Sequence, residues 1–153
     1  MIVTLTNHSL TAQIDSIGAQ LISLKDTAAD TEYIWQRDPA YWKSCSPLLF
    51  PTVGNCRDGK YTLNGQTYTI PKHGFCRNAD FAVSVLSKQE ASFTITDSPE
   101  TRACYPFAFQ LKLTYTLAED GIQIHYTVTN PGTETMYYQL GAHPGFNCPL
   151  HSG

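Results

Sequence analysis

The sequence contains no long hydrophobic run, no block of like charge and no repeated segment. Its apolar clusters fall well short of the roughly 20 residues that a helix needs to cross a bilayer, so we expect a soluble protein without a membrane segment. Charged residues make up only 15% of the 153 positions, and 13 acidic against 10 basic residues give a formal charge of −3. This balance provides no basic surface of the kind that nucleic-acid binding requires.

The five cysteines form no Cys-x-x-Cys pair, and the N-terminus lacks the hydrophobic stretch of a secretory signal. We therefore expect reduced thiols and a cytoplasmic location. The cysteines and histidines are also scattered, and a pair such as His73 and Cys76 supplies at most half of a four-ligand zinc site. We expect buried or incidental thiols and no metal site.

Helical periodicity is not convincing anywhere in the chain, whereas alternation of apolar and polar residues is common. Residues 111–117 are apolar at every odd position, and residues 122–129 alternate in the same way. A turn that ends in Asp-Gly separates them, which predicts an antiparallel hairpin. A second hairpin is predicted over residues 61–70, where Asn-Gly separates two short runs.

Further strands are expected wherever Val, Ile, Thr, Tyr and Phe gather. These segments are residues 2–6, 10–14, 20–24, 81–86, 92–96 and 136–140. Many short strands joined by Gly, Pro and Asn turns favour an all-β fold, an antiparallel β-sandwich that forms one domain over residues 1–153. Residues 41–59 carry two prolines and two glycines without clean alternation. Irregular backbone of this length is typical of a functional site.

Two histidines lie beside glycines in turn-like segments, His73 in His-Gly-Phe and His143 in His-Pro-Gly. Glycine allows a sharp turn, and an imidazole pKa of about 6.5 suits proton transfer at neutral pH. The alternative is an ordinary histidine with a satisfied hydrogen bond. His125 illustrates that alternative, because it shares a strand face with Gln123 and Thr127 and is expected on a polar face of the sheet.

Six blocks spread along the chain carry a resemblance to a known family. They are residues 17–24 (IGAQLISL), 32–36 (EYIWQ), 41–43 (YWK), 47–54 (PLLFPTVG), 73–77 (HGFCR) and 141–147 (GAHPGFN). In order and spacing, these blocks resemble the aldose 1-epimerase (mutarotase) family, and within it the bacterial epimerase-like proteins encoded beside sugar operons. The resemblance covers essentially the whole chain.

The resemblance implies a galactose mutarotase-like supersandwich that binds a hexose in a cleft and interconverts its α and β anomers without metal or organic cofactor. Opening a pyranose requires an acid that protonates the ring oxygen and a base that removes the proton of the C1 hydroxyl. Matched to the family's motifs, His143 resembles the general acid. His73 resembles the histidine that hydrogen-bonds to the sugar and polarises it.

The family's other contacts to sugar hydroxyls are matched less completely. Its Asn-Arg pair has an interrupted counterpart in Asn55 and Arg57, and alignment to the turn at Gly65 favours Asn55. Arg77 fits the motif of the bacterial branch. It is expected either to contact the ligand or to be an exposed structural arginine.

Members of the family are considerably longer, and both their catalytic glutamate and a sugar-binding aspartate come from the part that would follow Gly153. We therefore expect about the N-terminal half of a mutarotase-like domain, with impaired catalysis. Among the carboxylates present, Glu32, beside Tyr33 and Trp35, is the least implausible replacement for the base. Half a sandwich would expose a strand edge and an apolar face, which favours a homodimer or a C-terminal partner chain.

The second hypothesis is a non-catalytic carbohydrate-binding β-sandwich. In it, aromatic side chains stack on one face of a sugar while Arg57 and Arg77 bind its hydroxyls. The aromatic candidates are Trp35, Trp42, Phe75 and Phe146. Aromatic residues of a sandwich belong to the core more often than to a sugar platform.

Overall fold

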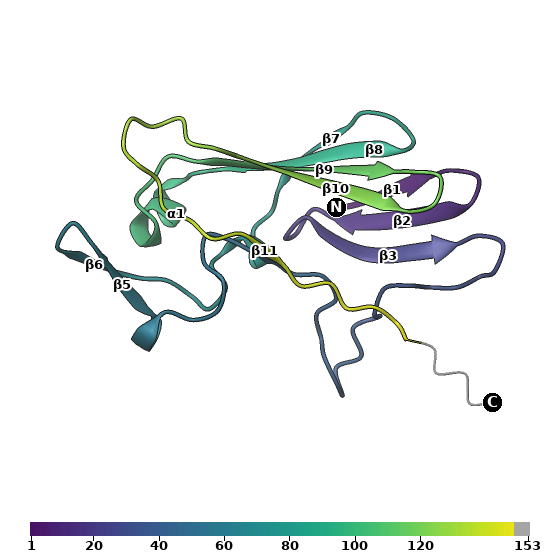
Figure 1. The fold of residues 1–153 in the computed structure, drawn as a ribbon, viewed down its shortest axis with the longest axis horizontal. Helices are drawn as coiled ribbons and strands as arrows, with labels where there is room; N and C mark the ends of the chain where they lie inside the picture. Colours follow the sequence, from purple (N-terminus) through teal and green to yellow (C-terminus); the bar gives the residue numbers. More distant parts are fainter. Residues whose placement is uncertain (149–153) are drawn as a thin grey trace.

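The computed structural model describes residues 1–148 and is almost entirely β-structure. The last five residues of the expected domain, 149–153, lie outside the described part. Two antiparallel sheets form the main layers (Figure 1). The first contains β1 (Ile2–Thr6), β2 (Leu10–Asp15) and β3 (Gln20–Asp26) in that order. The second has the order β10-β9-β8-β7, from β7 (Ala82–Val85), β8 (Glu90–Thr96), β9 (Gln110–Leu117) and β10 (Ile122–Thr129).

The core lies between these two sheets because each strand turns its apolar positions inward. In β9 every second residue from Leu111 to Leu117 is buried, and β2 alternates in the same way from Leu10. A buried hydrogen bond also joins the layers, from the Tyr115 hydroxyl to the Ala19 carbonyl at 2.6 Å. The all-β sandwich expected from the alternation is confirmed.

Both predicted hairpins are confirmed. Strands β9 and β10 pair along their whole length. Strands β5 (Lys60–Leu63) and β6 (Gln66–Thr69) form a separate two-stranded sheet that projects from the main layers (Figure 1). Asn64 and Gly65 both have positive φ between these strands, as a tight two-residue hairpin turn requires.

A short helix, α1 (Pro99–Cys104), lies outside the elements that the alternation predicts. Its N-terminus is stabilised by a reciprocal cap in which Ser98 and Thr101 bind each other's backbone N–H. Six residues are too few to show helical periodicity. The cap residue followed by proline is the signal that marks this helix in the sequence.

The strand predicted over residues 136–140 is wrong. These residues belong to no strand and make isolated hydrogen bonds instead of a ladder, from Gln139 N–H to the Pro51 carbonyl at 2.9 Å and from the Tyr105 hydroxyl to the Tyr137 carbonyl at 3.0 Å. The strand β11 begins one residue later, at Gly141–Ala142, and pairs with β4 (Leu48–Leu49). Strand-forming residues give a strand only where a partner ladder is within reach.

The irregular segment around β4 anchors two distant parts of the chain. The Phe50 carbonyl accepts hydrogen bonds from Phe75 N–H at 3.1 Å and Cys76 N–H at 3.4 Å. The Phe50 ring is fully buried in the core. Two short 3₁₀ helices follow these segments. η1 (Arg57–Gly59) comes after the segment that contains β4, and η2 (Cys76–Asn78) comes directly after Phe75.

Among the described residues, no helix is long and apolar enough to span a membrane.

Gly74→Ala is expected to destabilise the protein far more than Gly65→Ala. Both glycines have positive φ, so both substitutions incur the left-handed backbone penalty of about 1–2 kcal/mol. A Cβ on Gly74 would also lie 2.0 Å from the Phe50 carbonyl oxygen, whereas a Cβ on Gly65 meets nothing within 4 Å. Urea unfolding should give a loss of about 3 kcal/mol or more for Gly74→Ala. Equal losses for the two variants would contradict this account.

Candidate active site

His73 and His143 lie together in a cavity of about 210 Å³, called here the histidine cavity. The lining residues come from the segment before and within β4, the loop after β6, η2 and the residue that follows β11. They are Trp42, Pro47, Leu49, Lys72, His73, Arg77 and His143. Among the described residues, the charged groups of the lining are therefore cationic, and none of the lining residues is a carboxylate.

His143 is positioned by the pairing of β11 with β4. Its backbone N–H continues that pairing by donating to the Pro47 carbonyl at 3.2 Å. Its ring meets the Trp42 ring edge to face, with centroids 5.3 Å apart and planes at 86°. The Trp42 carbonyl in turn accepts a hydrogen bond from Trp35 Nε1 at 2.6 Å. The imidazole remains exposed, so it is available to a ligand.

His73 is held by two reciprocal hydrogen bonds with Gly54. The His73 N–H donates to the Gly54 carbonyl at 2.8 Å, and the Gly54 N–H donates to His73 Nδ1 at 3.0 Å. His73 also has a positive φ of 67°, so the backbone turns sharply at the histidine itself. Because Nδ1 accepts a hydrogen bond, the proton of the neutral ring lies on Nε2.

The surroundings of His73 favour its neutral form. Desolvation lowers the pKa of His73 below its ordinary value of 6.5, and the positive charges of Lys72 and Arg77 lower it further. His143 adds a smaller effect in the same direction. At neutral pH, His73 is therefore a hydrogen-bond donor through Nε2.

Of the three predicted sugar-binding residues, one lines the histidine cavity and two do not. Arg77 lines the histidine cavity and donates from Nη2 to Ser44 Oγ at 3.2 Å. Asn55 and Arg57 are exposed and do not line it. Asn55 directly follows Gly54, the residue that holds His73, so it is the nearer of the two along the chain.

Glu32 does not line the histidine cavity, and its carboxylate already accepts hydrogen bonds from other residues. Its carboxylate accepts hydrogen bonds from Ser23 Oγ at 2.5 Å and from the backbone N–H groups of Leu24 and Ile34, both at 2.9 Å. It lines a separate cavity together with Phe146. These contacts give Glu32 a structural role, in which it ties β3 to residues 32–34.

The four aromatic residues considered as a sugar platform do not share one cavity. Trp42 lines the histidine cavity, whereas Trp35 and Phe146 line the cavity that contains Glu32. Phe75 packs on the core, with its ring 6.4 Å from that of Phe50. His125 is exposed on the outer face of β10, as predicted.

Cys45 and Cys76 are buried, as expected for packing thiols, and burial raises the pKa of both. Within residues 1–148, no three His, Cys, Asp or Glu side chains gather closely enough to hold a metal ion.

Pro47, Leu49 and Lys72 complete the cavity without having been predicted as site residues. Pro47 and Leu49 belong to the irregular stretch 41–59, and Lys72 directly precedes His73. Their position beside predicted site segments is the only signal in the sequence that points to them.

Solved structures establish the class of fold. A galactose mutarotase-like protein from Lactobacillus casei ATCC 334 is 38% identical, with a TM-score of 0.96, and the match covers 99% of this chain and 52% of that chain. A galactose mutarotase related enzyme from Lactobacillus acidophilus is also 38% identical with a TM-score of 0.96, over 100% of this chain and 51% of the other. The fold is therefore that of the galactose mutarotase-like proteins.

The aldose 1-epimerase family profile matches residues 1–153, so the chain belongs to the aldose 1-epimerase family. The plasmid-encoded protein LacX of Lactococcus lactis subsp. lactis is 39% identical over 159 residues, which cover 100% of this chain and 53% of LacX. The chain thus spans about half the length of the curated relatives it matches.

Titration of His73 tests this description of the cavity. The midpoint of its imidazole resonances in NMR should lie below 6.5, because burial and two cations disfavour the charged ring. Lys72→Ala removes one of these cations and should move the midpoint upward. Lys88→Ala, which removes an exposed lysine outside the cavity, serves as the control and should leave it unchanged. A midpoint above 6.5, or equal shifts in the two variants, would refute the assignment.

Proposed function

We propose that the histidine cavity is part of the hexose site of an aldose 1-epimerase, where α and β anomers interconvert by acid–base ring opening. The observation that carries this proposal is the placement of His73 and His143 in one cavity within a family of aldose 1-epimerases. The two histidines differ in exposure and in hydrogen bonding, so they are suited to different roles.

His143 acts as the general acid. Its imidazolium transfers a proton to the ring oxygen of the sugar while the bond between that oxygen and C1 breaks, and a base takes the proton of the C1 hydroxyl. The product is the open-chain aldehyde. Rotation about the C1–C2 bond followed by the reverse proton transfers closes the other anomer. The Pro47 hydrogen bond and the Trp42 ring hold His143 in place for this transfer.

His73 binds and polarises the sugar. Its Nε2–H donates to a sugar oxygen, and its lowered pKa keeps the ring neutral at neutral pH. Arg77 also lines the cavity and donates to sugar hydroxyls. Asn55 and Arg57 contribute only at the edge of the bound sugar, since neither lines the cavity.

The general base comes from outside the described residues. The cavity lining contains no carboxylate in residues 1–148, and Glu32 is hydrogen-bonded elsewhere. Residues 1–153 then form the N-terminal portion of one mutarotase-like domain. The remainder of such a domain supplies the missing group, whether it belongs to the same chain, to a C-terminal partner chain or to a second copy. The positive lining favours this arrangement, because Lys72 and Arg77 attract an incoming carboxylate.

The same absence of a carboxylate supports the second candidate, a carbohydrate-binding protein without catalysis. Trp42, His73 and Arg77 can bind a sugar in the histidine cavity whether or not a base is present. The two candidates differ in one measurable quantity, the rate of anomerisation at saturating sugar.

The chain alone should accelerate the mutarotation of α-D-glucose and α-D-galactose weakly, as measured by polarimetry. Without a base, the rate should fall about 10²- to 10⁴-fold below that of a full-length family member with mutarotase activity. His143→Ala should remove the remaining acceleration. Sugar binding detected by NMR at residues 72–77 without any acceleration would instead favour the carbohydrate-binding protein.

His125→Ala provides the matched control, because His125 is an exposed histidine on the outer face of β10. This variant should retain the activity of the unmodified chain. If His125→Ala and His143→Ala lose activity equally, the role given to His143 is wrong. A rate at the level of the full-length member would refute the proposal that the base is missing.

A further inference from the structure

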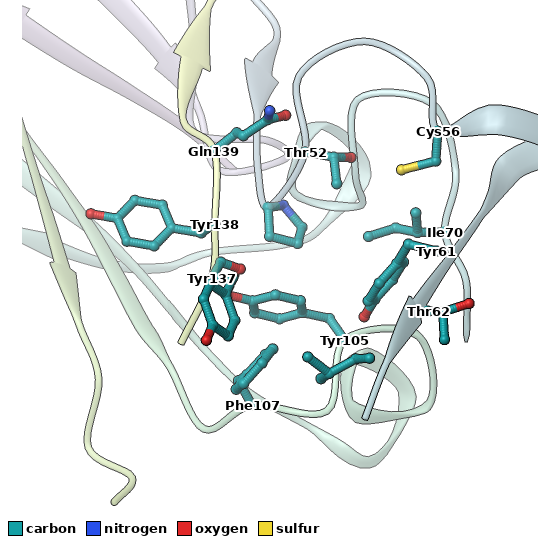
Figure 2. Close-up of a pocket in the computed structure, with 12 residues that line it drawn as sticks. Thr52, Cys56, Tyr61, Thr62, Ile70, Tyr105, Phe107, Tyr137, Tyr138 and Gln139 are labelled. Atoms are coloured by element: carbon teal, nitrogen blue, oxygen red, sulfur yellow. The ribbon is translucent and has the colours of Figure 1, made fainter. Parts of the chain in front are cut away.

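A second hollow lies between the β5–β6 hairpin, the segment that follows α1 and residues 137–139, and is called here the aromatic cavity (Figure 2). Its volume is about 480 Å³, compared with about 210 Å³ for the histidine cavity. Tyr61, Tyr105, Phe107 and Tyr137 form much of its wall. Apolar cavities of several hundred Å³ are typical of small-molecule sites.

The tyrosine walls are fixed by their own hydroxyl groups. The Tyr61 hydroxyl donates to the Cys104 carbonyl at 2.9 Å, and the Tyr105 hydroxyl donates to the Tyr137 carbonyl at 3.0 Å. These bonds tie the hairpin to α1, and α1 to the segment before β11. With both hydroxyls engaged, the rings present mainly carbon surface to the cavity. Tyr61 also stacks on Tyr68, with centroids 5.4 Å apart and planes at 22°.

A polar cavity of about 430 Å³ adjoins the aromatic cavity. The two hollows share three lining residues, which are Leu63, Phe107 and Tyr137. The polar cavity adds amide and hydroxyl side chains, which donate and accept hydrogen bonds, and a carboxylate, which accepts them. These are Asn64, Gln66, Glu134 and Thr135.

The polar side chains of this second hollow remain available to a ligand. Among residues 1–148, no intramolecular hydrogen bond engages the side-chain amides of Asn64 and Gln66 or the carboxylate of Glu134. No Lys or Arg lines either hollow in the described part of the chain. An anionic ligand would therefore meet Glu134 without a compensating cation.

We propose that the aromatic and polar cavities together bind a neutral glycoside, a ligand class separate from the free hexose of the histidine cavity. The sugar ring lies among Asn64, Gln66 and Glu134, which hydrogen-bond its hydroxyls. An apolar aglycone of aromatic ring size lies in the aromatic cavity against Tyr105 and Phe107. Tyr137 lies at the junction and contacts both parts of the ligand.

Isothermal titration calorimetry with phenyl β-D-glucopyranoside tests the proposal. The phenyl glucoside should bind at least about tenfold more tightly than methyl β-D-glucopyranoside or phenol, since each of these fills one cavity only. Phenyl β-D-glucuronide should bind more weakly than the glucoside, because its carboxylate faces Glu134. Equal affinity for the glucoside and for either fragment would overturn the proposal.

Tyr137→Ala should weaken binding of the phenyl glucoside about tenfold. Its side chain is 65% exposed, and the carbonyl that binds Tyr105 is retained, so the fold should persist. Gln66→Ala, on the exposed part of β6, should weaken binding through the sugar alone. Tyr41→Ala, which removes a tyrosine that is 83% exposed outside both cavities, is the matched control and should leave the affinity unchanged.

His143→Ala separates the two sites and should leave glucoside affinity unchanged. If His143→Ala abolishes binding while Tyr137→Ala does not, the glucoside occupies the histidine cavity and the inference is wrong. If no titration shows saturable binding, the cavities serve another occupant, such as a polypeptide segment, and the inference is wrong as well.

Discussion

Both cavity histidines depend on one short segment, residues 47–54. The Pro47 carbonyl binds the His143 N–H, and Gly54 binds both the backbone and the ring of His73. Phe50, between them, lies fully buried with its ring 5.4 Å from that of Phe109. The segment is therefore rooted in the core at its centre and carries one histidine at each end. Any displacement of this segment would move the two imidazoles relative to each other. The packing of Phe50 in the core therefore also determines the geometry of the site.

The parts of the fold that sequence patterns could predict are those whose information is local. The β9–β10 and β5–β6 hairpins are each encoded by two alternating runs and the turn between them, so a single stretch of sequence contains the whole unit. The helix α1 is equally local, but it is too short for periodicity, and only its cap marks it. Residues 136–140 show the limit of this approach. They have the composition of a strand, yet the partner that would make them one is elsewhere in space.

The candidate site, in contrast, depends almost wholly on contacts between residues far apart in the sequence. His73 and His143 could be singled out from their turns, and their family resemblance suggested roles, but nothing in either turn specifies that the two meet. Their meeting requires the two-residue pairing of β4 with β11 and the contact of Gly74 with Phe50, both between distant segments. Glu32 shows the same limit. Its sequence neighbours Tyr33 and Trp35 suggested an apolar setting, whereas its carboxylate accepts hydrogen bonds from Ser23 and Leu24 of β3, a contact that its own segment does not specify.

The same segment also borders two hollows that differ in charge. Leu49 faces the histidine cavity, whose charged lining is cationic, whereas Pro51 and Thr52 face the aromatic cavity, which no charged residue of the described chain lines. Gln139 crosses this boundary by donating its N–H to the Pro51 carbonyl and accepting the Val53 N–H on its side chain. Gly54 follows directly and holds His73, so one short stretch of backbone, residues 51–54, both borders the aromatic cavity and fixes an imidazole of the histidine cavity.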